Sequence, residues 1–410
     1  MTTTVECRTV VTGLGAVTPN GLGVDTYWSA ILEGRSAIAP FSRWEPQTYP
    51  VRVGGEIRDF VVREHVPGRL RPQTDRVTQY AIAASDWALA DAGVIVSELD
   101  EFDVGVITAN GCGGFEFGQK ELQKLWSTGP HLVSAYQSFA WFYAVNTGQI
   151  SIHHGIKGHS SVVVTEQAGG LDALAHARRL VAGGSLKVAL CGGLDAPLCP
   201  WGLAAQMPNG YMSEVADETR AYLPFDRQAA GYVPAEGGAL LTLENHEEAR
   251  DRGVERFYGE LAGYAATFDP HPRTGRPGTL PTAIRGALAD AGLRPDEVDV
   301  VLADAIGALD LDLAEARAIA EVFGPRGVPV AVPKALTGRL YSGGGPLDTV
   351  AALLMIRDGV IPAMPQPVDT PVGYDLDLVV GQPRETPIRS ALVIARGLGG
   401  FNSALVVRAV

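Results

Sequence analysis

The chain has 410 residues, of which 46% are hydrophobic and 19% charged, a composition typical of folded globular proteins and not of disordered ones. Its 33 basic and 46 acidic residues give a net charge of −13, without a cluster of Lys and Arg, so we expect no binding of nucleic acid or of a membrane surface. The N-terminus lacks a signal-peptide pattern, no apolar run would span a bilayer, and the four cysteines are scattered. We therefore expect a cytoplasmic protein.

Continuous β-branched runs alternate with Ala- and Leu-rich helical patterns along the chain. Such runs are typical of strands buried on both faces, and the alternation indicates an α/β fold. We expect strands at residues 8–13, 104–109, 161–165, 187–191, 298–304, 328–332 and 391–395. We expect helices at residues 78–92, 168–182, 313–323 and 345–357.

A weak internal echo suggests two similar halves. VITANGCGGFEFG in the first half and VLADAIGALDLDL in the second both run from a strand through a turn of small residues into an acidic or aromatic segment. Each half also ends in a predicted strand pair, residues 188–191 with 239–244 and residues 391–395 with 404–407. We place the boundary in the charged stretch ENHEEARDRG, which divides the chain into residues 1–250 and 251–410.

Two glycine-rich segments and one histidine pair suggest ligands but do not fit them. GLGAVTPNG lacks the third glycine of a dinucleotide fingerprint, and GLGGF near the C-terminus is not followed by the Lys-Ser/Thr of a phosphate loop. His153 and His154 are adjacent, and adjacent side chains of a strand point to opposite faces. We therefore expect no metal site and no cofactor held by these segments.

The segment SVVVTEQAGGLDALAHARRLVA predicts a buried strand, a sharp turn and a helix, with Gln167 on the turn. Many α/β enzymes present a nucleophile in this way, where the helix dipole lowers a thiol pKa and amide N–H groups stabilise an oxyanion. A glutamine can form neither a thiolate nor an acyl-enzyme. Taken alone, Gln167 could equally be a polar turn residue without a function.

Three segments, SVVVTEQAGGLDAL, ALCGGLDAP and YLPFDRQAAGYVPAEGGALLTLE, resemble the β-ketoacyl synthases in order and spacing across nearly the whole chain. VVTGLGAVTPNG at the start and GLGGFNSALVV at the end fit the same pattern. The resemblance implies the thiolase fold, an α/β fold of two similar halves with mixed sheets in a five-layered α-β-α-β-α arrangement.

Condensing members of this family use a Cys on the turn and two His in AHGT-like and GHS-like motifs. In this sequence the Cys position is Gln167, the first His position is Asp304, and the second is Arg339. Lys334 matches the family's lysine. Arg stays protonated, and an ionised Asp cannot donate a hydrogen bond to a thioester carbonyl. The resemblance therefore implies vestigial positions and no condensation by this chain.

TEQAGG and GGFEFGQKELQKLW are similar to the chain length factors, the ketosynthase β subunits of bacterial type II aromatic polyketide synthases. This resemblance implies a subunit that is inactive alone and forms a heterodimer with a ketosynthase α subunit. An acyl carrier protein would bring its phosphopantetheine arm to the partner's cysteine, so no cofactor is expected on this chain. The aromatic-rich segment SAYQSFAWFYAVNTGQISIHHG matches the family's dimer region, although it could also be internal core.

Three other functions remain open from the sequence. A Gln on the turn also occurs in loading domains that decarboxylate a malonyl thioester, although those domains keep the histidines that this chain lacks. An independent enzyme would need a reactive residue near the turn, and Cys112 is the only cysteine near such a position. A scaffold without a tunnel would show no dependence of the product on its own residues.

Phe115, Gly118 and Leu122 are spaced i, i+3 and i+7, so on a helix they share one face. In the chain length factors that this sequence resembles, this face lines the end of the tunnel that holds the growing polyketide. Gly118 has no side chain and Leu122 is smaller than an aromatic residue, so we expect a product longer than an octaketide, with decaketide size as the best guess. Cys112 is a further candidate lining residue, and the alternative is that Gly118 merely allows close helix packing.

Overall fold

The structure, a computed structural model, describes residues 8–45, 48–364 and 369–410. Its main sheet contains β1 (Thr9–Thr18), β2 (Gly21–Leu22), β5 (Val104–Ala109), β6 (Ser160–Val163), β7 (Val188–Asp195), β8 (Gly237–Asn245), β9 (Gly259–Phe268), β10 (Val300–Leu302), β11 (Pro329–Ala331), β13 (Asp377–Leu378), β15 (Ser390–Gly397) and β16 (Phe401–Arg408). The two small sheets pair β3 (Ile38–Pro40) with β4 (Val53–Gly55) and β12 (Val360–Ile361) with β14 (Arg384–Glu385).

The helices lie between and around these strands. They are α1 (Val24–Leu32), α2 (Val62–His65), α3 (Arg76–Asp91), α4 (Phe115–Ser127), α5 (Gln137–Ala140), α6 (Val145–His154), α7 (Gly169–Ala182), α8 (Pro200–Gln206), α9 (His246–Asp251), α10 (Leu280–Ala291), α11 (Leu309–Phe323) and α12 (Gly344–Asp358). The boundary expected near residue 250 falls within α9. No helix in the described part of the chain is long and apolar enough to cross a membrane.

The sheet consists of two half-sheets with the same strand order. The order β1-β8-β7-β5-β6 in the first half corresponds to β9-β16-β15-β10-β11 in the second, and each half starts with antiparallel pairs and ends with parallel pairs. β1 joins β9 at two residue pairs, Val10 with Glu260 and Val11 with Gly259. The predicted repeat of two similar halves with mixed sheets is therefore confirmed.

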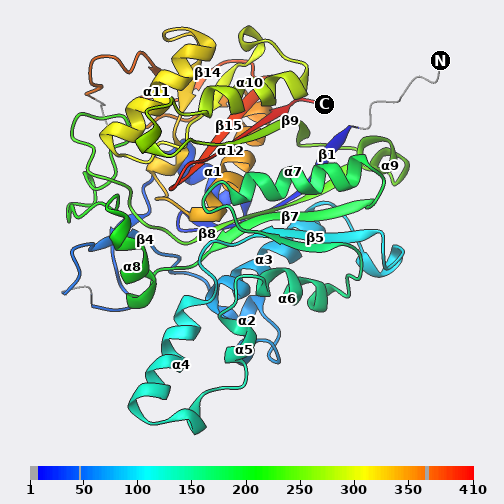
Figure 1. Ribbon diagram of the computed structural model, residues 1–410. Helices are drawn as coiled ribbons and strands as arrows, with labels where there is room; N and C mark the ends of the chain where they lie inside the picture. The colour runs from blue at the N-terminus through cyan, green and yellow to red at the C-terminus, as the bar shows by residue number, and fades with distance from the viewer. Residues whose placement is uncertain (1–7, 46–47, 365–368) are drawn as a thin grey trace.

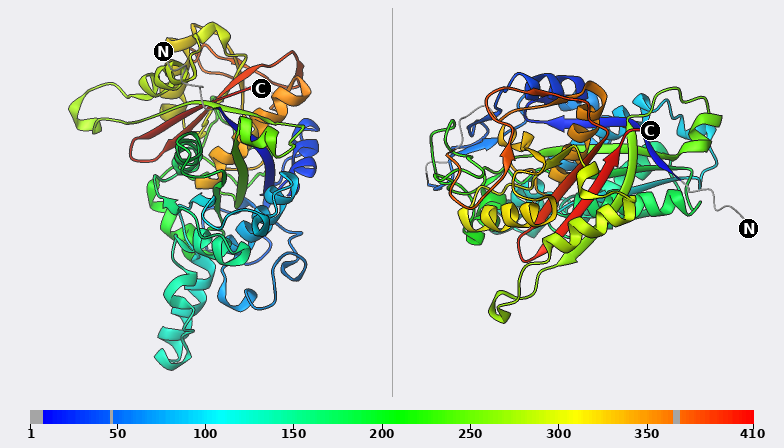
Figure 2. Two further views of the ribbon diagram at one scale, coloured as in Figure 1. Left: turned by 90° about the vertical axis from the view of Figure 1, so that its right-hand side faces the viewer. Right: turned by 90° about the horizontal axis from the view of Figure 1, so that it is seen from above.

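Five layers follow from the way the helices cover the half-sheets (Figures 1 and 2). α7 and α12 contact each other between the two half-sheets, α3 and α6 cover the outer face of the first, and α10 and α11 cover that of the second. One cluster of buried apolar side chains surrounds the central helix layer and reaches both half-sheets, and a separate cluster lies under the outer helices of each half. The predicted α-β-α-β-α arrangement is confirmed.

A pair of glycines shows how alike the two halves are at the level of packing. A Cβ on Gly13 of β1 would lie 2.2 Å from the carbonyl oxygen of Ala88 on α3. A Cβ on Gly263 of β9 would lie 2.2 Å from the carbonyl oxygen of Ala287 on α10. Both distances are shorter than a van der Waals contact between carbon and oxygen. In each half, therefore, only glycine lets the outer helix lie this close to its strand.

Most predicted elements agree with the structure within a few residues. β5 spans residues 104–109 as predicted, and α7 and α12 differ from their predictions by a single residue at one or both ends. The strand interpretation of His153 and His154 is wrong, because both lie in the last turn of α6. β9 and α10 were not predicted, although they complete the second half.

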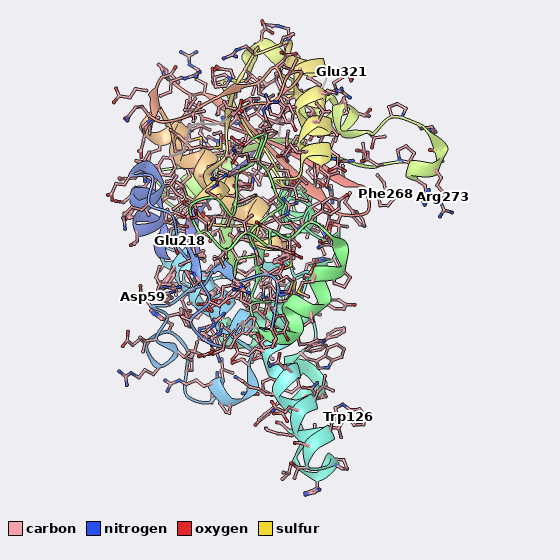
Figure 3. All side chains as sticks on the ribbon, turned by 90° about the vertical axis from the view of Figure 1, so that its left-hand side faces the viewer. Asp59, Trp126, Glu218, Phe268, Arg273 and Glu321 are labelled. Carbon is pink, nitrogen blue, oxygen red and sulfur yellow. The ribbon has the colours of Figure 1, made fainter. Side chains whose placement is uncertain are left out.

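The segment of residues 115–143, here called the arm, projects from the layered body (Figures 1 and 3). It comprises α4, α5 and the turns between and after them. Its exposed apolar side chains are Trp126, Leu132, Tyr136, Trp141, Phe142 and Tyr143, with exposed fractions from 38% to 82%. The alternative that these aromatic residues are internal core is wrong, whereas the following helix α6 does bury Val145 and Ile150.

Candidate functional site

The turn that carries Gln167 links β6 to α7. The preceding residue, Glu166, has a φ of 53°, a conformation that a non-glycine residue adopts at a cost of about 1–3 kcal/mol. Gln167 is only 3% exposed, and its Nε2 has no hydrogen-bond partner among the described residues. The position that the sequence predicts for a nucleophile is therefore inside the protein and carries an amide.

The first turn of α7 is held by the second half of the chain. Asp172 accepts hydrogen bonds from Thr165 before the turn, from Tyr264 of β9 at 2.6 Å, and from Ser403 of β16. These contacts fix the turn relative to both half-sheets. The position of Gln167 thus depends on residues that follow it by about 100 and 240 positions in the sequence.

Asp304 and Arg339, the two vestigial histidine positions, form a buried ion pair. Arg339 Nη2 lies 2.9 Å from Asp304 Oδ2 and 3.1 Å from Oδ1, and the two side chains are 3% and 7% exposed. Nη2 also donates to the carbonyl oxygen of Arg396 at 2.7 Å, and the backbone N–H of Arg396 donates to Asp304 Oδ1 at 3.0 Å. The pair therefore joins the loops after β10 and β11 to β15.

The charge on Arg339 is fixed by this environment. Burial alone would lower the pKa of the guanidinium, but the Asp304 carboxylate raises the pKa above its ordinary value. The loop of Asp304 is held in turn by the buried carboxylate of Glu315, which accepts the backbone N–H groups of Asp304 at 2.7 Å and Ala305 at 2.9 Å. The pair can therefore neither shuttle protons at neutral pH nor polarise a thioester as two histidines would.

Lys334 lies beside this pair, and its ammonium group is also engaged in an ion pair and a hydrogen bond. Its Nζ lies 2.6 Å from Asp348 Oδ2 on α12 and also donates to the carbonyl oxygen of Ala303. Burial raises the pKa of Asp348, whereas Lys334 lowers it. The family's lysine position thus keeps a structural contact between the loop after β11 and the central helix layer.

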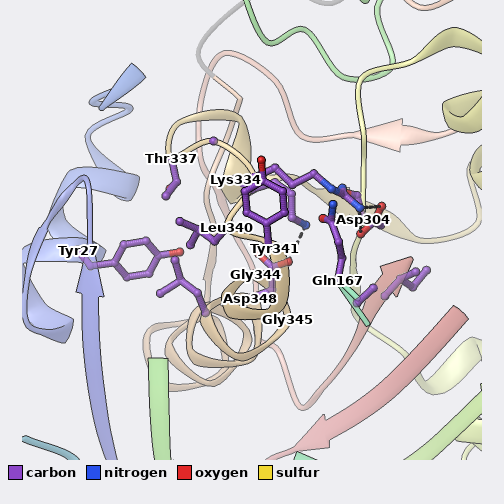
Figure 4. A pocket seen from close by; sticks show the side chains of 15 residues that line it. Tyr27, Gln167, Asp304, Lys334, Thr337, Leu340, Tyr341, Gly344, Gly345 and Asp348 are labelled. Atoms are coloured by element: carbon purple, nitrogen blue, oxygen red, sulfur yellow. Dashed lines mark hydrogen bonds and ion pairs between the residues drawn. The ribbon is translucent and has the colours of Figure 1, made fainter. Parts of the chain in front are cut away.

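The pocket around these residues is almost filled. Gln167, Asp304, Lys334, Arg339 and Asp348 all line it, and the remaining cavity measures about 10 Å³. A single water needs roughly 10–15 Å³. Figure 4 shows Gln167, Asp304, Lys334 and Asp348 around the pocket, on separate stretches of the chain. An acyl chain or a malonyl group has no room here.

Glu166, directly before Gln167, has a carboxyl pKa that is strongly shifted toward neutrality. Burial raises its pKa to about 7, opposed by Arg339 and assisted by Asp304. Its Oε2 has no partner among the described residues. Backbone hydrogen bonds from Gln167 and Leu398 and the charge of Arg339 offset the burial of Glu166 only in part, and Glu166 does not line the filled pocket.

A larger cavity of about 570 Å³ lies on the other side of Asp304. It is bounded by the end of β9 and by the turn Gly397–Gly400, which joins β15 to β16 as the sequence predicts. Asp304 lines both cavities, so the ion pair with Arg339 stands between them.

Cys112 lies just before α4 and does not line the filled pocket, although Tyr341 of that pocket belongs to the same buried cluster. It is 6% exposed and belongs to a buried cluster, and its backbone N–H donates to Asp195 Oδ1 at 2.9 Å. Burial raises the pKa of its thiol well above the ordinary value, and the Asp195 carboxylate raises it further. A thiol of this kind stays protonated, which argues against Cys112 as a nucleophile.

Phe115, Gly118 and Leu122 lie on α4 and share a helix face, as their spacing predicts. Trp201 of α8 covers this face: its ring lies 4.9 Å from that of Phe115, and its Cζ3 would lie 2.7 Å from a Cβ on Gly118. The sequence analysis missed Trp201, and the only local signal was a tryptophan directly after the proline that opens a short helix. The indole fills the space that the absent side chain of Gly118 leaves.

The structure thus brings the three vestigial positions together and places the α4 residues and Cys112 elsewhere. Gln167, Asp304 and Arg339 line one pocket with Lys334. The α4 face lies on the arm, packed against α8. Whether it lines a tunnel for a growing chain stays a prediction.

Comparisons with known proteins agree with this geometry. Residues 7–249 match the family model of the β-ketoacyl synthase N-terminal domain, and residues 258–366 match that of the C-terminal domain. The chain is 60% identical to the tetracenomycin polyketide synthase ketoacyl synthase β subunit of Streptomyces glaucescens, over 97% of this chain and 98% of that one. It is 57% identical to the actinorhodin polyketide putative β-ketoacyl synthase 2 of Streptomyces coelicolor, with the same coverage.

Among solved structures, the ishigamide ketosynthase/chain length factor superposes with a TM-score of 0.89 at 27% identity, covering 99% of this chain and 100% of that one. A type II acyl-carrier protein in complex with its ketosynthase bound to the hexaketide contains a chain that superposes with a TM-score of 0.87 at 28% identity. That match also covers 99% of this chain and 100% of that one.

Proposed function

The chain belongs to the β-ketoacyl synthase family, among the ketosynthase β subunits, and from this premise we propose that it is the non-condensing chain length factor of a type II polyketide synthase. It pairs with an active ketosynthase α subunit and shapes the tunnel in which the poly-β-ketone grows. As in the sequence analysis, it is an enzyme subunit only within that heterodimer and is inactive alone.

One observation carries the proposal: the pocket that would hold the reacting acyl group is filled by the protein's own ion pair. Asp304 and Arg339 are almost completely buried, and about 10 Å³ remains beside Gln167. A condensing site needs a nucleophile, two neutral hydrogen-bonding groups and space for the substrate, and none of these is present at this pocket.

The arm and the edge of the sheet support a protein partner. Trp126 is 82% exposed and Trp141 42%, and such a concentration of exposed aromatic residues is typical of an interface. Among the described residues β6 pairs only with β5, so its outer edge is open, and the following Val164 is 49% exposed. An unpaired edge strand is a template for a strand from another chain.

The acyl carrier protein brings the phosphopantetheine arm to the partner's cysteine, and no cofactor is held by this chain. One solved relative is an acyl-carrier protein complex of its ketosynthase, which supports an acyl carrier protein as a partner of this heterodimer. The cytoplasmic location expected from the sequence is part of this proposal, and the free, buried thiols of Cys112, Cys191 and Cys199 fit a reducing compartment.

Acyl transfer tests the inactivity. The purified chain is incubated with malonyl-carrier protein and acyl-carrier protein, alone and with the ketosynthase, and each subunit is weighed by mass spectrometry. We expect no acyl adduct on this chain in either case and an adduct on the ketosynthase in the pair. A Gln167→Cys variant is the matched control and should also stay unmodified, because the filled pocket excludes the acyl group. Stoichiometric acylation of the unaltered chain would overturn the proposal.

Control of chain length is tested on α4. Gly118→Phe and Leu122→Phe, made in the heterodimer, should shift the product toward shorter polyketides while the complex still forms. Gly118→Phe also displaces the Trp201 indole, so Leu122→Phe, on a half-buried position, is the cleaner variant. An unchanged product in both variants, with intact complexes, would count against the tunnel assignment, including the expected decaketide size.

The decarboxylase alternative finds no supporting observation. Decarboxylation of a malonyl thioester needs space for the thioester beside Gln167 and a group that polarises its carbonyl, but the pocket is filled and its Arg339 is engaged by Asp304. We expect Gln167→Ala in the heterodimer to weaken activity modestly and to leave the product unchanged. Loss of malonyl decarboxylation in that variant, with the complex intact, would put the decarboxylase first.

A further inference from the structure

Two imidazoles and a carboxylate meet on the outer layer of the first half, far from the residues discussed so far. His153 and His154 end α6, and Asp86 faces them from α3. His153 Nε2 lies 2.9 Å and His154 Nε2 3.5 Å from the same oxygen, Asp86 Oδ1. From this geometry we propose that Asp86, His153 and His154 bind a divalent transition-metal ion of the zinc class.

The distances between the three groups are those of a metal site. Zn²⁺ binds imidazole nitrogen and carboxylate oxygen at about 2.0–2.2 Å, so neighbouring ligand atoms of a tetrahedral site lie about 3.3 Å apart. The distances of 2.9 Å and 3.5 Å bracket this value, and one possible ligand atom from each of the three residues lies within 4.8 Å of the others. Small rotations of the side chains would therefore complete the site without a backbone movement.

The helical geometry explains why adjacent histidines can act together. On α6 their rings lie 4.5 Å apart between centroids, in an edge-to-face arrangement, and both turn toward α3. The side chains are 16% and 13% exposed, which limits their motion, and the Asp86 side chain is 41% exposed. Two imidazoles with one carboxylate favour zinc and similar ions over Mg²⁺ or Ca²⁺, which prefer oxygen ligands.

The surroundings of the three residues have space for the ion and for a water molecule bound to it. A solvent-accessible cavity of about 470 Å³ adjoins the cluster, so water can fill the fourth position. Ser85 Oγ, which donates to the carbonyl oxygen of Ile82, lies 2.8 Å from His154 Nε2 and therefore accepts the ring N–H. When the metal binds Nε2, this proton leaves the nitrogen for solvent and Nδ1 takes one up, so the ring stays neutral as the Nδ1–H tautomer.

Zinc titration of the full chain tests the site. We use protein without an affinity tag in a Cys7→Ser background, because Cys7 lies outside the described residues and Cys112, Cys191 and Cys199 are buried. We expect one Zn²⁺ per chain by calorimetry and a higher melting temperature with zinc. We also expect visible absorption bands of tetrahedral Co²⁺ when cobalt is added instead.

Variants separate this cluster from other histidines. His153→Ala and His154→Gln should each weaken zinc binding at least 10-fold, and Asp86→Asn should weaken it similarly while keeping a hydrogen bond to the rings. The control is His159→Ala with His176→Ala, a second histidine pair with ring centroids 5.4 Å apart that belongs to no metal-ligand cluster among the described residues. That control should bind zinc as the parent does.

Two results would overturn the proposal. One is a parent chain that binds no zinc at a concentration of about 100 µM. The other is zinc binding that all three cluster variants retain at parental affinity. Circular dichroism tests whether each variant is folded, and because the Asp86 side chain is 41% exposed, Asp86→Asn in particular should fold.

Discussion

The filled pocket and the arm are opposites in burial and in chemistry. Gln167, Asp304 and Arg339 are at most 5% exposed and are held by an ion pair and by backbone hydrogen bonds. The arm exposes aromatic rings, Trp126 most of all at 82%. The region that is catalytic in condensing relatives has become part of the core, whereas the features that suggest a function lie at the surface.

Under the proposed function, the loss of catalysis and the contact with a partner lie at separate places in the fold. The pocket keeps the loops after β10 and β11 in position through Asp304 and Arg339. The arm exposes the aromatic rings of Trp126 and Trp141, whereas the apolar face of α4 packs against Trp201 of α8. Substitutions in the two regions should therefore have distinct consequences, on stability in the first and on assembly or product in the second.

The largest effect is expected from breaking the buried ion pair. Arg339→Ala leaves the Asp304 carboxylate buried without its partner, which costs about 3–5 kcal/mol of the free energy of unfolding. Denaturant unfolding followed by circular dichroism measures this change. The double variant Asp304→Leu, Arg339→Leu removes both charges and should recover much of the loss. A single variant within about 1 kcal/mol of the parent would show that the pocket is not structural.

A pH-dependent effect is expected at Glu166. Its folded pKa of about 7 lies above the ordinary 4.5, so the folded state binds the extra proton between these values. The contribution of the Glu166 carboxyl to the free energy of unfolding of the parent is therefore fully present below pH 4.5. It is lost as the pH rises through about 7. Glu166→Gln cannot ionise, so its stability relative to the parent should rise by about 3 kcal/mol between pH 4.5 and 8. Thermal unfolding at both pH values measures the difference, and a difference that is independent of pH would contradict it.

Substitution of Trp201 should have a smaller effect on stability and should also change the length of the polyketide product. Trp201→Ala removes the ring that packs against Phe115 and covers Gly118. Because the indole is only half-buried, we expect a loss of about 1–2 kcal/mol. In the heterodimer the space that it leaves should lengthen the polyketide, as mass spectrometry of the product would show. A product that stays the same would remove Trp201 from the lining of the tunnel.

The smallest effect on stability is expected at the tip of the arm. Trp126→Ser should change the free energy of unfolding by less than about 0.5 kcal/mol, because its side chain is already exposed. It should nevertheless weaken association with the ketosynthase, measured by size-exclusion chromatography at decreasing concentration. Val372→Ser is the matched control, since Val372 is 97% exposed outside the arm and should affect neither property. Unchanged association of the Trp126 variant would exclude this residue from the interface.

The sequence predicted those parts of the fold that have a continuous local pattern. β5 and α7 are long and apolar, and their periodicity fixes them without tertiary information. Resemblance, and not periodicity, identified Gln167, Asp304 and Arg339 as one site. β9, with the sequence GELAGYAATF, escaped prediction because small residues interrupt its apolar pattern, and it is the paired neighbours β1 and β16 that make it a strand.

Contacts between distant segments could not be predicted from sequence. Trp201 meets Gly118 across 83 positions, and nothing local to either residue indicates the other. The histidine pair was predicted to lie in a strand, where adjacent side chains point to opposite faces. In the structure the pair lies in a helix, which brings the two rings together. In both cases the missing information was the relative placement of elements, which sequence patterns do not contain.

The buried pair also bears on evolution. Restoring a histidine at residue 339 alone would leave the Asp304 carboxylate uncompensated in the core, and restoring one at residue 304 alone would do the same to the Arg339 guanidinium. Each single reversion is therefore unfavourable before any activity returns, and Gln167→Cys adds a thiol that no acyl group reaches. Condensing activity would therefore return only through several simultaneous substitutions. Once the buried pair had formed, single substitutions could no longer reverse the proposed division of labour between the two subunits.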